Sequence, residues 1–397
     1  MWPFRSCAIF LVAVGLLTPR HSGVVAFSPS QRTKWCLSSR SYFGYFGSRH
    51  GLHGNTDKPN SAAAEYDFDK ETGVNAVRVP LSFIGPYPCI SLRFPKLATS
   101  SQQSRNVTGI SLDFVLDTAA NTNTINAQVA SELALEVVGT ALPGVGAGGT
   151  ISGGDTYMLG DCELDGLPPG DNFTFMTDLT ASALPLASPA AAGLLGVYFF
   201  NAFTGGVEFS WGDSSTSTPA SLTFYADVGE MDSVLSGLGK IEVSQLPDSG
   251  LPSITINVNG VAIPALFDTG SPITVFNAEA AKLAGIHAVE VEGQEKSKNP
   301  FARLTQGLKS AQAVARGDIV MIAGANGNSV ELLKSKSKVD ISSGNVKIGK
   351  SGVFIGDLPG LKALGGLGAT APPAVVLGMD FLCLRPRVIY RANEVFM

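Results

Sequence analysis

Two short segments of the chain each place an aspartate between a strand-like apolar run and a turn of small residues. The clearer one is Asp268-Thr269-Gly270-Ser271, and the other is Asp117-Thr118-Ala119-Ala120, 151 residues earlier. A carboxylate next to apolar strands is costly unless its oxygens are held, so both aspartates are candidate functional residues. Two carboxyls at close range cannot both ionise. Such a pair can therefore act on one water molecule as a general base and a general acid.

The similarity between the two halves extends beyond the aspartates. At the same offset Asn126 aligns with Asn277, and a short helix is expected after each, over residues 128–135 and 279–286. A second landmark, two apolar residues followed by glycine, occurs once in each half and ends at Gly196 and at Gly378. A unit that occurs twice predicts two lobes of similar construction.

The paired segments resemble the active-site loops of the aspartic proteases, in particular the two-lobed, single-chain members with pepsin-like or retropepsin-like lobes. The resemblance covers about residues 77–397. It implies an all-β, bilobal fold with two pseudo-symmetric, barrel-like lobes and short helices. It further implies a monomeric endopeptidase in which Asp117 and Asp268 activate water to hydrolyse a polypeptide substrate, with no cofactor and no metal.

The resemblance also gives supporting roles to residues around the aspartates. Thr118 and Thr269 are expected to reach across to the opposite lobe and lock the two loops together. Gly270 is expected to let the backbone approach a carboxyl closely. The strands that end at Gly196 and Gly378 are expected to support the loops from beneath.

A β-hairpin flap over the cleft is expected in the glycine-rich stretch of residues 144–157. Gly146 and Gly148 lie where its mobile tip is expected. For Tyr157 two interpretations stay open: it is the flap tyrosine, or it is a strand residue packed on the core.

The first loop departs from the family pattern at two positions. Ala119 stands where the family has glycine, and a φ above zero would strain an alanine there. Ala120 has no hydroxyl, whereas Ser271 is expected to donate to the outer oxygen of Asp268 and so to favour its ionised form. Two interpretations stay open: a working protease that tolerates the alanine, and a catalytically inactive relative that binds peptides in the same cleft.

Composition supports a β-rich, two-domain protein and argues against several other classes. The 397 residues are 45% hydrophobic and 15% charged, with 45 glycines and 23 prolines. A net charge of −5 without a basic stripe argues against nucleic acid as a partner. After residue 55 the sequence has one histidine, His287, which argues against a histidine-ligated metal or a histidine-activated nucleophile.

The first 75 residues have the composition of a targeting leader. Residues 1–26 resemble a signal peptide, with a basic start and an apolar run too short to span a bilayer, so no stable membrane insertion is expected; a membrane anchor is the alternative. Residues 27–75 have no acidic residue before Asp57 and fit either a transit peptide or a disordered pro-segment.

The junction at Phe27 resembles the bipartite leaders of algae with secondary plastids, so we expect a plastid protein. A secreted or endomembrane-lumen protein is the alternative, and the sequons at Asn106 and Asn172 would suit it. The lobes are expected at residues 76–225 and 226–397.

Overall fold

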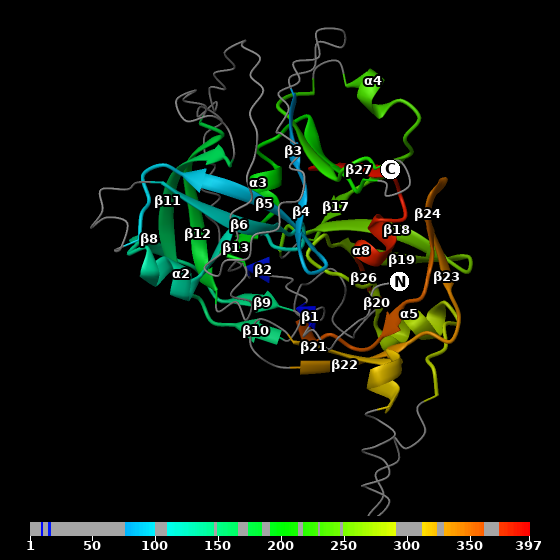
Figure 1. The fold of residues 1–397 in the computed structure, drawn as a ribbon. Coiled ribbons are helices and arrows are strands. Elements are labelled where there is room, and N and C mark those ends of the chain that lie inside the picture. Colours follow the sequence, from blue (N-terminus) through cyan, green and yellow to red (C-terminus); the bar gives the residue numbers. More distant parts are fainter. Residues whose placement is uncertain are drawn as a thin grey trace, which may run out of the picture.

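The computed structural model describes residues 76–99, 109–146, 149–165, 174–184, 191–212, 217–228, 231–246, 249–290, 312–323, 329–360 and 373–397, with the dipeptides Ile9–Phe10 and Gly15–Leu16. The predicted leader, apart from those dipeptides, and the asparagines of both sequons lie outside the described residues. The described part consists mainly of β-strands with a few short helices (Figure 1). None of its helices is long and apolar enough to cross a bilayer.

The first half of the chain forms an eight-stranded sheet in the order β4-β5-β6-β13-β7-β12-β11-β8. Strand β5 also pairs with β11, so the sheet curls toward a closed barrel. Alternating burial along β5 places Leu92 and Phe94 in the core, where Phe94 contacts Phe114 of β6. The strands are β4 (Ser82–Ile84), β5 (Tyr87–Phe94), β6 (Ile110–Leu116), β7 (Thr124–Asn126), β8 (Glu136–Thr140), β11 (Asp155–Leu164), β12 (Met176–Leu184) and β13 (Gly193–Leu195).

The second half forms the other large sheet, in the order β21-β22-β25-β20-β26-β19-β18-β23-β24, with β17 paired to β18. Its strands are β17 (Ser244–Gln245), β18 (Pro252–Val258), β19 (Val261–Phe267), β20 (Val275–Phe276), β21 (Ile319–Ala323), β22 (Ser329–Lys334), β23 (Val339–Ser343), β24 (Val346–Ser351), β25 (Phe354–Ile355) and β26 (Val375–Leu377). Figure 1 shows the two sheets on opposite sides of the molecule. The predicted all-β, bilobal fold is confirmed.

A third sheet of six strands joins the lobes, in the order β16-β28-β27-β14-β15-β3. Three of its strands precede residue 226: β3 (Ala76–Pro80), β14 (Gly206–Ser210) and β15 (Ser221–Tyr225). The other three follow it: β16 (Lys240–Glu242), β27 (Arg387–Arg391) and β28 (Glu394–Phe396). The contact between β14 and β27 continues the hydrogen bonding from one half into the other, which ties the lobes together through backbone bonds.

The predicted repeat has the same topology in both lobes. Strand β6 pairs in parallel with β13, with Leu116 opposite Leu195, and β19 pairs in parallel with β26, with Phe267 opposite Leu377. The helices α2 (Ala127–Glu132) and α5 (Ala278–Leu283) follow the aspartate loops and are N-capped by asparagine side chains. Both end earlier than predicted, because the chain turns left-handed at Ala134 and at Gly285.

Each lobe also contains a hairpin that pairs with a short segment near the start of the chain. In the first lobe this is β9 (Gly144–Gly146) with β10 (Gly149–Ile151), and in the second it is β21 with β22. Two dipeptides near the start of the chain, β1 (Ile9–Phe10) and β2 (Gly15–Leu16), pair with β21 and β9, respectively (Figure 1). An edge of each hairpin is therefore paired with an extended segment.

Candidate active site

The two aspartates meet at the interface between the lobes. Asp117 follows β6 and Asp268 follows β19, and both are fully buried. Their backbone N–H groups donate to the strands that end before Gly196 and Gly378. Asp117 N donates to Leu195 O of β13 at 3.0 Å, and Asp268 N donates to Leu377 O of β26 at 3.1 Å. A Cβ built on Gly270 would lie 2.5 and 2.6 Å from the two oxygens of Asp117. The second loop therefore packs directly against the carboxyl of the first.

Reciprocal hydrogen bonds between two threonines join the loops. The Thr118 hydroxyl donates to Phe267 O at 2.7 Å and accepts from Thr269 N at 3.0 Å. The Thr269 hydroxyl donates to Leu116 O at 2.8 Å and accepts from Thr118 N at 3.1 Å. All of these donors and acceptors are buried. Each hydrogen bond therefore gives a partner to two polar groups that water cannot reach. This is the arrangement that the family resemblance implies for the two threonines.

Ala119 is accommodated without backbone strain. Its φ does not lie in the left-handed region, so the strain considered for a methyl at this position is absent. Its N–H donates to Asp117 Oδ1 at 2.8 Å. The backbone contact that a glycine would make here is therefore kept by the alanine.

Burial raises the pKa values of both aspartates. Burial raises the pKa of Asp268 to about 7. Burial, together with the charge of Asp268, raises the pKa of Asp117 well above its ordinary value. Asp268 is therefore the carboxyl that ionises first, while Asp117 keeps its proton.

The expected role of the Ser271 hydroxyl is wrong. This hydroxyl donates to Ile273 O at 2.7 Å and not to Asp268. Ser271 instead acts on Asp268 through its backbone N–H, which lowers the pKa of Asp268 against the larger effect of burial. The difference between Ser271 and Ala120 is thus not the cause of the asymmetry between the aspartates.

Gly196 and Gly378 lie where the chain passes very close to the aspartate loops. A Cβ would lie 2.5 Å from Thr122 O at Gly196 and 2.5 Å from Ile273 O at Gly378. No side chain fits between those backbones without moving them. The predicted support from beneath the loops thus consists of direct backbone packing.

Three side chains that sequence reasoning missed also hold these loops. Asn123 Oδ1 accepts from Gly196 N at 3.1 Å in the first lobe, and Thr274 Oγ1 accepts from Gly378 N at 3.0 Å in the second. Thr274 in turn donates to Asp380 through its hydroxyl at 2.6 Å and its N–H at 3.0 Å. Burial raises the pKa of Asp380 to about 6, against the effect of these donors. Position 274 aligns with 123 at the repeat offset, which was the available signal.

We expect Asp380→Ala to weaken the second loop. The substitution leaves the buried N–H and hydroxyl of Thr274 without their acceptor, so the free energy of unfolding should fall by about 1–3 kcal/mol. Urea unfolding measures this change. The matched control is Tyr198→Ala, since Tyr198 occupies the equivalent position after Gly196 and is 69% exposed. Equal destabilisation by the two substitutions would contradict the role given to Asp380.

The three residues predicted for the flap do not all lie in one hairpin of the described structure. Gly146 lies in β9 of the first-lobe hairpin, and Gly148 lies outside the described residues. Tyr157 lies in β11, opposite Ala181 of β12, where it is partly buried against the main core cluster. Of the two interpretations of Tyr157, the strand residue packed on the core fits this position.

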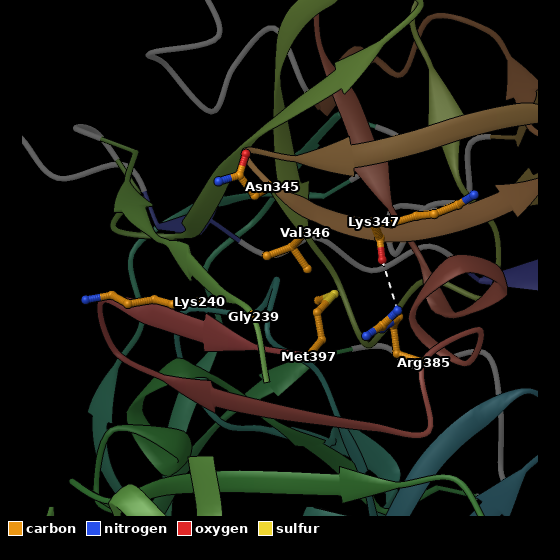
Figure 2. A pocket seen from close by; sticks show the side chains of 7 residues that line it. All are labelled: Gly239, Lys240, Asn345, Val346, Lys347, Arg385 and Met397. Carbon is orange, nitrogen blue, oxygen red and sulfur yellow. Dashed lines mark hydrogen bonds between the residues drawn. The ribbon is translucent and has the colours of Figure 1, made fainter. Parts of the chain in front are cut away.

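A hollow of about 400 Å³ lies between β16, β24 and the chain end (Figure 2). None of the predicted site residues lines it. The ammonium groups of Lys240 and Lys347 point away from it in opposite directions and pair with Glu394 and Asp340. These charges do not converge on a ligand position, and we assign no function to the hollow.

The fold and this site together define an all-β, two-lobed protein with a buried pair of aspartates between its lobes. Residues 105–199, which include the first aspartate loop, match the model of a family described as aspartyl protease. No curated protein matches the sequence. The family match supports a protease of the aspartic class.

Proposed function

We propose that the protein is an aspartic endopeptidase that hydrolyses peptide bonds with water activated between Asp117 and Asp268. The observation that carries this proposal is the pairing of two fully buried aspartates on loops locked together by Thr118 and Thr269. A buried carboxyl pair with separated pKa values is suited to general acid–base catalysis near neutral pH.

The mechanism follows from the order of ionisation. Ionised Asp268 takes a proton from the attacking water, whose oxygen forms a bond to the carbonyl carbon of the scissile peptide. Protonated Asp117 donates its proton to the carbonyl oxygen, which gives a neutral tetrahedral diol. When the C–N bond breaks, the amine leaves with one proton from the pair and the carboxylic acid is released.

The substrate that we propose is an extended polypeptide. The edge of β9 pairs in antiparallel fashion with Gly15–Leu16, and β21 pairs in parallel with Ile9–Phe10. These edges thus accept an extended backbone by strand addition, a common mode of peptide recognition. The apolar character of residues 8–17 favours apolar substrate residues near the scissile bond.

We also propose the finer features predicted from the sequence: a monomer with lobes at 76–225 and 226–397, directed to the plastid by the leader. A working range near neutral pH would suit that location. We expect this pH range because burial raises the pKa of Asp268 to about 7 and activity rises as this carboxyl ionises. Activity is expected to fall again at higher pH as Asp117 loses its proton.

Digestion of casein or a peptide library from about pH 4 to pH 9 tests the proposal, with and without a statine-type inhibitor. We expect inhibitor-sensitive cleavage, and a loss of about 10³-fold in kcat/KM for Asp268→Asn. The matched control is Asp113→Asn, because Asp113 lies four residues before Asp117 but is exposed on β6. Inhibitor binding without cleavage by the wild type would instead support the catalytically inactive, peptide-binding relative.

A further inference from the structure

The methyl group of Ala119 packs with the opposite lobe. Ala119 is fully buried and belongs to a hydrophobic cluster whose other members are mainly second-lobe residues. Among these are Leu266, two residues before Asp268, and Val376 on the strand that supports Asp268. The next residue, Ala120, is equally buried but belongs to a cluster of the first lobe, with Val115 and Leu194.

The pseudo-symmetry of the loops indicates what this methyl faces. At the equivalent position of the second loop, a Cβ on Gly270 would be directed at the Asp117 carboxyl, 2.5 and 2.6 Å from its oxygens. In the first loop Ala119 occupies the corresponding position, and its apolar neighbours Leu266 and Val376 lie on the strands that lead to and support Asp268. The Asp117 carboxyl accepts a hydrogen bond from Ala119 N at 2.8 Å, and the N–H groups of Gly270 and Ser271 face the Asp268 carboxyl.

We infer that Ala119 is a positioning residue whose methyl group keeps water from the Asp268 carboxyl and moves the ionisation of the aspartate pair toward neutral pH. An apolar group against a carboxyl disfavours the charged form and raises the pKa. The alanine is thus a determinant of the working pH range and no sign of a degenerate loop. The link to working pH rests on the proposed protease function, but the effect on Asp268 does not.

Few other groups act on the Asp268 carboxyl within the described part of the chain. Asp117 faces it from the first loop, and the N–H groups of Gly270 and Ser271 face it from its own loop and lower its pKa in part. Asp380, on the helix α8 (Met379–Leu382) that follows the supporting strand, directs its carboxyl to Thr274. Desolvation of the Asp268 carboxyl raises its pKa, and the backbone N–H donors lower it. A substitution at Ala119 is expected to change the desolvation and to leave these donors in place.

The test is the titration of Asp268 by 13C NMR in the full chain labelled at the aspartate carboxyl carbons, with the signal assigned by its loss in Asp268→Asn. We expect Ala119→Gly to lower the titration midpoint of Asp268 by about 1 pH unit, because water replaces the methyl group. Ala119→Ser keeps the Cβ atom and adds a hydroxyl group beside the carboxyl. It should also lower the midpoint, so the inference can be tested even if the glycine variant does not fold.

The matched control is Ala120→Gly, which removes the same methyl from the neighbouring buried position and should leave the Asp268 midpoint where it is. An unchanged midpoint in both Ala119 variants, or an equal shift in Ala120→Gly, would overturn the inference. If the wild type cleaves peptides, the acid limb of its pH–rate profile should move down with the midpoint. A shifted midpoint in a chain without cleavage would refute the proposed function and leave the role of Ala119 standing.

Discussion

Gly270→Ala is expected to reduce kcat/KM for peptide cleavage by at least about 100-fold. The added methyl group would lie 2.5 and 2.6 Å from the oxygens of Asp117, a separation that no real side chain shows, so the loop or the carboxyl must move. Displacement of a catalytic group by about 1 Å can cost a factor of this size. Overpacking of a buried site also lowers the free energy of unfolding, typically by about 1–3 kcal/mol.

A glycine elsewhere in the second lobe provides the control for this prediction. A Cβ on Gly352 would meet one atom of Lys334 at 3.6 Å, an ordinary contact, and its φ is not in the left-handed region. Gly352→Ala should therefore retain activity and stability. Steady-state kinetics and urea unfolding of the two variants side by side measure both effects. Full activity of Gly270→Ala would mean that the loops do not pack as closely as the structure has them.

The contrast between Gly270 and Ala119 explains why the sequence alone left the function open. At the sequence level an alanine in the place of glycine indicates either tolerance or decay, because the direction of its Cβ is unknown. The structure gives Ala119 a favourable φ, an intact N–H bond to Asp117 and apolar neighbours in the other lobe. The departure that made the first loop doubtful is thus compatible with the geometry of the pair.

The features predicted from the sequence are those with a local or a repeated signature. Apolar runs on both sides of an acid predict strands, and the repeat predicts that the lobes have similar folds. Hydrogen bonds between side chains leave no such signature. Thr274 and Asp380 are 106 residues apart, and their contact depends on how α8 follows β26. Ser271 illustrates the same limit. Its hydroxyl donates to the backbone oxygen of Ile273 and not to the Asp268 carboxylate that is expected from the sequence.

The six-stranded sheet was likewise beyond prediction. It places β3, from the start of the body, and β27, from its end, in one sheet through the pairing of β14 with both β15 and β27. No repeat or spacing in the sequence relates these strands. The sheet matters for the site because it holds the lobes in contact away from the aspartates. The threonine bonds therefore need only to align the two loops.

Thr118→Val is expected to abolish cleavage and to lower the free energy of unfolding by about 2–4 kcal/mol. Valine keeps the shape of threonine but removes the hydroxyl, so Phe267 O and Thr269 N lose their partner in a buried interface. Thr269→Val should act in the same way through Leu116 O and Thr118 N, because the two networks are reciprocal. Thr118→Ser restores the hydroxyl at the cost of one methyl and should recover most of the activity.

The comparison of valine with serine separates the hydrogen bonds from packing. If the threonines mainly filled space, valine would be tolerated and serine, which leaves a small cavity, would be the more damaging substitution. The reverse order is expected here, in both urea unfolding and kcat. A double variant, Thr118→Val with Thr269→Val, should cost less than the sum of the single substitutions, because the two hydroxyls belong to one network. Strict additivity would show that each threonine serves its own lobe and that the aspartates are aligned by other contacts.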